Sequence, residues 1–135
     1  MADHIAFLIK KDNNFLFIKR SLKKKKLPGA WGLPSGTREG TDSDFDTAKR
    51  EAMEELGVQV EPQKEFFKFH NKQFDDWVIF VLCELQSGEP SIKAPDEIEE
   101  IVWMSFTEFY TNNPEGTIAH GLELLRNQKE IWEDL

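Results

Sequence analysis

Three glutamates at helical spacing are the residues of this sequence best suited to do chemistry. They lie in the stretch AKREAMEELGV, residues 48–58. At about 100° per residue, Glu51, Glu54 and Glu55 fall within roughly a 100° arc of one helix face. Their like charges repel at this spacing, so a bound cation would stabilise them, and hard divalent cations prefer carboxylate oxygens. The glutamates alone fit either a metal site or a solvated acidic face, and the flanking segments bear on the choice.

Capping residues at both ends indicate that a well-defined helix carries these glutamates. Ser43 followed by Asp46 resembles a capping box, and Gly57 supplies the left-handed residue that commonly ends a helix. We therefore expect a helix over residues 44–56. An apolar stripe lies about a quarter-turn from the acids, so the helix can pack and still present them. The stripe consists of Phe45, Ala48, Ala52 and Leu56.

A glycine-rich loop, LPGAWGLPSGTREGTDS at residues 27–43, leads into this helix. Together they form a longer pattern: Gly36, five residues, Asp42, seven residues, then REAMEELGV. This pattern resembles the Nudix box of the MutT/Nudix hydrolase superfamily. Its chance probability is on the order of 10⁻⁸ per start position with average residue usage. GAWGLPSG and FLFIKRS also resemble the segments that precede the box in that family.

The resemblance implies a fold and a reaction. The fold is an α/β (α+β) protein, a Nudix-like α/β/α sandwich with a mixed sheet, in a single domain over residues 1–135. The reaction is Mg²⁺-dependent hydrolysis of a phosphoanhydride in a nucleoside diphosphate linked to a group X, with Mn²⁺ as a substitute. A nucleoside triphosphate giving monophosphate and pyrophosphate is the favoured case. The alternatives are hydrolysis of ADP-ribose, a nucleotide sugar or a dinucleoside polyphosphate, and a non-catalytic nucleotide sensor.

The resemblance also assigns roles to residues. Glu51, Glu54 and Glu55 supply metal ligands, since bound divalent cations neutralise phosphate charge and acidify the attacking water. Arg50 orients one of the box glutamates through an ion pair. Gly36 lets the loop backbone run close to the metal, where a side chain would obstruct. The expected catalytic set is thus Arg50, Glu51, Glu54 and Glu55, with Gly36 beside the metal.

Two departures from the family pattern and two open assignments remain. Asp42 stands where a glutamate is usual and Ser35 where a glycine is usual. The resemblance implies that the acid at position 42 braces the loop or contacts the outer shell of the metal, with one methylene less reach than a glutamate. Arg20, at a predicted strand end, is a candidate phosphate contact, with a solvated surface arginine as the alternative. The general base is either Glu54 or one of three acids in the segment PDEIEEIVW. Those acids are Glu97, Glu99 and Glu100, and Glu54 is favoured because it needs no loop closure.

Composition limits the partners. The 135 residues carry a net charge of −8, which argues against binding nucleic acid polymers or membranes. A small-molecule nucleotide remains compatible with this charge if metal ions and basic residues neutralise it locally. The run LKKKK at residues 22–26 is interpreted as a solvated loop, and the single cysteine, Cys83, as a buried structural thiol. With no signal-peptide pattern, a cytoplasmic location is expected. A homodimer is left open.

Hydrophobic patterns predict the other elements. Residues 4–11 and 14–20 should form a hairpin with Phe15 and Phe17 on one face. Short strands are expected at 58–62 and 65–70, a central strand at 76–85 and another strand at 100–105. Ser105 and Glu108 predict a second capping box before a short helix at 106–111. A last helix is predicted over residues 114–132.

Overall fold

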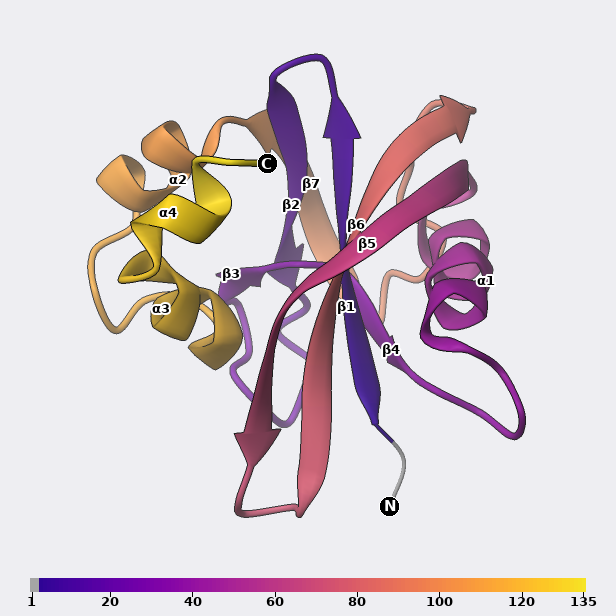
Figure 1. Cartoon of the computed structure of the whole chain (residues 1–135), viewed down its shortest axis with the longest axis horizontal. Helices are drawn as coiled ribbons and strands as arrows, with labels where there is room; N and C mark the ends of the chain where they lie inside the picture. The colour runs from indigo at the N-terminus through magenta and orange to yellow at the C-terminus, as the bar shows by residue number, and fades with distance from the viewer. Residues whose placement is uncertain (1–2) are drawn as a thin grey trace.

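The computed structural model describes residues 3–135 as one mixed β-sheet with helices on both faces (Figure 1). The strands are β1 His4–Lys11, β2 Asn14–Arg20, β3 Trp31–Gly32, β4 Ser35–Thr37, β5 Gln59–Asn71, β6 Asp76–Ser87 and β7 Ile98–Met104. The helices are α1 Asp44–Leu56, α2 Phe106–Asn112, α3 His120–Arg126 and α4 Lys129–Trp132. The main strand order is β3-β2-β1-β6-β5, and β4 pairs with β1 while β7 pairs with β2. β1 and β6 are parallel, whereas the other pairs are antiparallel. The predicted α/β/α sandwich with a mixed sheet is confirmed.

Alternating side chains on the two central strands divide the core between the two faces of the sheet. Ile5, Phe7 and Ile9 of β1 are fully buried on the face that α1 covers. Ala6 and Leu8 point to the other face, which α2, α3 and α4 cover (Figure 1). The period of two residues in a strand produces this division. The phenylalanines Phe15 and Phe17 share one face of β2, as predicted, and Cys83 is a buried thiol whose pKa burial raises to about 12.

β1 and β2 separate soon after their hairpin, and this separation creates room for a site. The registered pairs between them are Lys10 with Phe15 and Lys11 with Asn14. Toward its start, β1 pairs instead with the short strand β4, from His4 to Ala6. The end of β2, the strand β4 and the helix α1 therefore surround one region. Among the described residues 3–135, no helix is long and apolar enough to cross a membrane.

Helix α1 begins and ends at the predicted residues. The Ser43 side chain accepts a hydrogen bond from the backbone N–H of Asp46, and the Asp46 carboxylate accepts one from Ser43. Gly57 ends the helix in the left-handed conformation, at φ 69°. Ala48, Ala52 and Leu56 are completely buried under the sheet. The prediction was wrong for Phe45, which is 36% exposed because it lies in the first turn, beyond the edge of the packed stripe.

Two other sequence predictions are corrected by the structure. The two short strands expected before and after residue 63 form one strand, β5, interrupted only by register shifts near Pro62 and Phe67. Proline has no N–H to donate, but β5 lies at the sheet edge, where an unpaired position is tolerated. The single helix predicted over residues 114–132 is instead two short helices, α3 from His120 and α4 from Lys129, and helical structure begins at His120 rather than at residue 114. Before it, Gly116 turns the chain at φ 85° and Ile118 forms a bridge with Trp31.

Candidate active site

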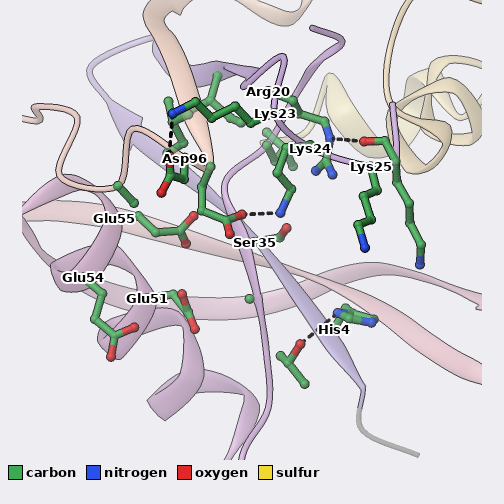
Figure 2. Close-up of a pocket in the computed structure, with 18 of the residues that line it drawn as sticks. His4, Arg20, Lys23, Lys24, Lys25, Ser35, Glu51, Glu54, Glu55 and Asp96 are labelled. Atoms are coloured by element: carbon green, nitrogen blue, oxygen red, sulfur yellow. Dashed lines mark hydrogen bonds and ion pairs between the residues drawn. The ribbon is translucent and has the colours of Figure 1, made fainter. Parts of the chain in front are cut away.

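The three glutamates of α1 face one large cleft, but they are buried to different depths (Figure 2). Glu55 is 6% exposed, while the side chains of Glu51 and Glu54 are 13% and 58% exposed. The difference arises because Glu55 follows the packed stripe of α1 toward the core, whereas Glu54 points away from it. The shared helix face predicted from the sequence is therefore confirmed, and the helix presents carboxylates in three distinct environments.

Gly36 and Arg50 fix the position of the Glu51 carboxylate. A Cβ atom placed on Gly36 would lie 2.1 Å from Cδ of Glu51, so only a glycine allows the carboxylate to rest against this strand. Arg50 donates from Nη1 to Glu51 Oε1 at 2.8 Å and lies 3.6 Å from Glu54 Oε2. The same arginine donates from Nη2 to the carbonyl of Thr37 at 3.1 Å. The Arg50 guanidinium thus connects the Glu51 carboxylate of α1 to the backbone at Thr37.

Asp42 lies on the other side of the Arg50 guanidinium. Its Oδ2 accepts from Arg50 Nε at 3.4 Å, a long hydrogen bond that still ties the end of the glycine-rich loop to α1. An aspartate therefore reaches the arginine despite being one methylene shorter than a glutamate. Ser35, the second departure from the family pattern, begins β4 and lines the cleft beside Gly36.

The buried carboxyl group of Glu55 lacks the partners that a buried charge requires. Its Oε2 is inaccessible to solvent and has no hydrogen-bond partner among the described residues. Burial raises the pKa of Glu55 to about 9, and the nearby carboxylates of Glu51 and Glu97 act in the same direction. Without a cation, burial therefore favours the protonated form of this group. A divalent ion would supply the missing partner and favour the ionised form.

Basic side chains form the opposite wall of the cleft, which has a volume of about 1190 Å³ (Figure 2). Arg20, predicted as a phosphate contact, lies at the end of β2, half-buried, with Nε donating to the Lys26 carbonyl at 3.1 Å. Burial lowers the pKa of Arg20, while the charges of Glu97 and Glu55 oppose that change. The loop after β2 adds Lys23, Lys24, Lys25 and Lys26. The run is a solvated loop, as interpreted, since Lys23, Lys25 and Lys26 are exposed, but it also lines the cleft directly after Arg20.

The structure separates the three candidate loop acids. Glu97 lines the cleft and forms an ion pair with Lys24. Glu99 and Glu100 belong to β7 and do not line the cleft, and Glu99 instead lies 3.2 Å from Lys19 Nζ. Asp96, beside Glu97, pairs with Lys23 at 3.1 Å, so two ion pairs join the loop after β2 to the loop before β7.

The donor set of α1 suits a hard divalent cation, although its side chains are not arranged around one. Within residues 3–135 no three His, Cys, Asp or Glu side chains converge as a formed metal site. The Arg50 contacts turn Glu51 and Glu54 toward the guanidinium. The unpartnered buried oxygen of Glu55 and the close approach at Gly36 nevertheless provide oxygen ligands in a confined space. The residues therefore fit a metal ion, which would require modest side-chain rotation.

Comparisons with known proteins agree with this arrangement. Residues 2–126 match the family model described as NUDIX domain. Nudix hydrolase 8 of Arabidopsis thaliana is 28% identical over 95% of this chain and 34% of its own length. The human 8-oxo-dGDP phosphatase NUDT18 is 26% identical over 93% of this chain and 39% of its own length. The MutT protein of Methanosarcina mazei superposes with a TM-score of 0.74 and 20% identity, covering 96% of this chain and 92% of that one.

The relatives are longer proteins. The chain spans 34–39% of the length of the curated relatives that it matches. The shared part is thus the domain that carries the acidic helix and the glycine-rich loop.

Proposed function

The chain belongs to the NUDIX domain family, and on that premise we propose that it hydrolyses the phosphoanhydride of a nucleoside diphosphate linked to a group X. The favoured substrate is a nucleoside triphosphate. Water adds across the bond between the α- and β-phosphates, and the products are the monophosphate and pyrophosphate. We also propose that residues 1–135 act as a single domain, because both cores pack on one continuous sheet.

The charge distribution of the cleft supports a phosphate substrate. Five cationic side chains, Arg20 and Lys23 to Lys26, face the carboxylates of α1. A phosphate chain between these walls would meet cations on one side directly and carboxylates on the other through a divalent ion. Both walls are needed to explain the site. Lysines that bind phosphate do not by themselves require three glutamates opposite them, and three glutamates that repel one another require a cation between them.

We assign the metal to Glu51, Glu54 and Glu55, with Gly36 leaving space beside them. A bound Mg²⁺, or Mn²⁺ in its place, would neutralise phosphate charge and make the attacking water more acidic. Arg50 has a positioning role: it holds Glu51 and anchors the loop carbonyl of Thr37. Arg20 contacts a substrate phosphate.

Glu54 is proposed as the general base. It is the most exposed of the three glutamates, and its contact with Arg50 is long, at 3.6 Å, so its carboxylate is free to accept a proton from water. Glu97 is the alternative, but its ion pair with Lys24 occupies its carboxylate. Glu99 and Glu100 are set aside because they lie outside the cleft lining.

The observation that carries the proposal is the buried, unpartnered Glu55 oxygen in a cleft whose opposite wall is basic. The test is product analysis over a panel of nucleoside triphosphates, nucleotide sugars, ADP-ribose and dinucleoside polyphosphates, with Mg²⁺, with Mn²⁺ and with chelator. We expect metal-dependent release of a nucleoside monophosphate. Tight nucleotide binding without turnover on any member of the panel would identify a sensor instead.

A further inference from the structure

Three polar side chains from three different strands meet beside the glycine-rich loop, although they lie at positions 4, 37 and 76 of the sequence. Nε2 of His4 on β1 lies 3.2 Å from Oδ2 of Asp76 on β6. On the other side of the ring, Nδ1 of His4 forms a hydrogen bond with Oγ1 of Thr37 on β4, at 3.3 Å. His4 lines the cleft (Figure 2), and so does Thr37. The imidazole of His4 thus connects a carboxylate on one strand to a hydroxyl on another.

The strand register places these residues in one row across the sheet. At its start, β1 lies between β4 and β6, and His4 is the pairing partner of Thr37 on one side and of Val78 on the other. Asp76 precedes Val78 by two residues, so both side chains point to the same face of the sheet. Directly opposite residues of antiparallel strands have Cβ atoms roughly 5 Å apart, which is within reach of His4 and Thr37. A shift of one residue in the register would separate them.

Asp76 anchors the imidazole from the buried side. Its side chain is 10% exposed, and its Oδ1 atom is inaccessible to solvent and has no hydrogen-bond partner among residues 3–135. Burial of a carboxylate is costly, so the contact with His4 at Oδ2 contributes strongly to its stabilisation. An ionised carboxylate only accepts hydrogen bonds, which keeps a proton on Nε2 of His4. A histidine bonded to a carboxylate in this way has a fixed ring orientation.

Thr37 transmits this restraint to the acidic helix. It is the last residue of β4, and α1 begins only at Asp44. The Thr37 carbonyl accepts a hydrogen bond from Nη2 of Arg50 at 3.1 Å, and Nη1 of the same guanidinium donates to Oε1 of Glu51 at 2.8 Å. Because a hydroxyl can donate and accept, Thr37 can bond to Nδ1 of His4 whether or not that nitrogen carries a proton. Movement of Thr37 would therefore displace the guanidinium that holds Glu51.

We infer that Asp76 and His4 are positioning residues that hold the Glu51 carboxylate in place through Thr37 and Arg50. The inference rests on the proposed function, because Glu51 is proposed there as a metal ligand. Metal ligands must be held within about 0.5 Å of the productive geometry, and the end of a three-residue strand needs added support to meet that demand. Both ring nitrogens of His4 are engaged, so the imidazole supports the loop and does not contact substrate.

Thr37→Val tests the connection with a small change, since valine has a similar shape, keeps the backbone carbonyl and lacks the hydroxyl. Calorimetric titration with Mn²⁺, without nucleotide, should show about 3- to 10-fold weaker binding, less than the roughly 10- to 100-fold typical of losing a direct partner of a metal ligand. Thr37→Ser keeps the hydroxyl and should restore the parent affinity. The matched control is Thr117→Val, which removes a hydroxyl bonded to the Pro114 carbonyl and should leave the affinity unchanged, because Thr117 does not line the cleft.

Double variants test whether the residues act together. His4→Ala and Asp76→Ala should each weaken Mn²⁺ binding by about the same 3- to 10-fold factor, and combining either with Thr37→Val should weaken it no further, because residues in one network are not additive. Multiplied effects in the double variants would show independent roles and overturn the inference. The control is His70→Ala, since His70 also pairs with an aspartate, Asp75 at 3.0 Å, but does not line the cleft.

A measurement without metal separates this inference from the proposed function. Hydrogen exchange of the Arg50 Nε–H proton, followed by NMR, reports how firmly the guanidinium is held. Thr37→Val and His4→Ala should accelerate this exchange by at least ~3-fold, because exchange follows local opening, whereas Thr117→Val should not.

Unchanged exchange in the Thr37 and His4 variants would refute the inference alone if the parent binds Mn²⁺ and hydrolyses nucleotides. Faster exchange with unchanged Mn²⁺ affinity would also overturn it, since Glu51 would then not depend on these contacts. Faster exchange in variants of a parent that neither binds Mn²⁺ nor hydrolyses any nucleotide would support the positioning of Glu51 and refute the proposed function.

Discussion

The two walls of the cleft carry opposite charges on different kinds of backbone. The acidic wall is one helix, capped at both ends and packed through fully buried alanines and a leucine. The basic wall, apart from Arg20, is the loop after β2, where Lys23, Lys25 and Lys26 are exposed. Lys23 and Lys24 hold their positions through ion pairs with Asp96 and Glu97. The acidic wall is fixed by packing, whereas the basic wall is a largely exposed loop that two ion pairs connect to the loop before β7.

This difference matches what each wall would have to do in the proposed reaction. Ligands of a metal ion must be held within a few tenths of an ångström, and residues on a packed helix meet that demand. Attraction of a phosphate chain by flexible lysines acts over several ångströms and tolerates movement. Changes to the acidic wall should therefore reduce turnover, and changes to the basic wall should reduce affinity.

The largest expected effect is on the acidic wall. Glu54→Gln and Glu55→Gln should each lower kcat by at least ~10²-fold, the size typical of losing a general base or a metal ligand. The control is Glu99→Gln. The Glu99 carboxylate pairs with Lys19 outside the cleft, so this substitution should leave kcat unchanged. A near-normal kcat in folded Glu54 and Glu55 variants would contradict their assignment as metal ligands or general base.

The pH profile of kcat for these variants distinguishes the base. Glu54→Gln should lose the acidic limb of the profile, whereas Glu97→Gln should keep it and change the rate by less than ~10-fold. Loss of that limb in Glu97→Gln would transfer the role of base to the loop.

An intermediate effect concerns stability without metal. Burial raises the pKa of Glu55 in the folded protein to about 9, above its ordinary value of 4.5, so the folded protein holds a proton that the unfolded chain releases between these pH values. The contribution of Glu55 to the free energy of unfolding should therefore be greatest below pH 4.5 and fall as the pH rises through the range in which only the folded protein keeps this proton. Urea titrations in EDTA should show this contribution as a difference between the parent and Glu55→Gln. Parallel pH profiles for the two proteins would show that Glu55 ionises normally.

The smallest expected effect is on the basic wall. Lys25→Ala should raise KM by about 3- to 10-fold and leave kcat unchanged, because it removes attraction that is the same for substrate and transition state. The increase should shrink as salt is added, since exposed charges are screened. Lys11→Ala, an exposed lysine at the β1–β2 turn, serves as the control. A fall in kcat for Lys25→Ala would mean that the loop takes part in the chemical step.

The local signals in the sequence were sufficient for the elements that carry the acidic wall. The helix at 44–56 with its two caps, and the second capping box at Ser105, depend on contacts within four residues, so they appear in the sequence directly. The spacing of Glu51, Glu54 and Glu55 likewise fixes their shared face. The glycine at position 36 could be recognised by its place in the family pattern.

Contacts between distant segments had to come from the tertiary structure. The sheet edge that tolerates Pro62, the depth of Glu55 and the position of the lysine run opposite the helix all depend on which strands pair. The same holds for Glu97, which reaches the cleft while Glu99 and Glu100 do not. Neighbouring residues of a strand point to opposite faces of the sheet, so the register of strand pairing decides which of them enters a site. By itself the sequence thus determined which groups can do the chemistry, because those signals are local, while the fold decided which of them meet, because that depends on strand pairing and burial.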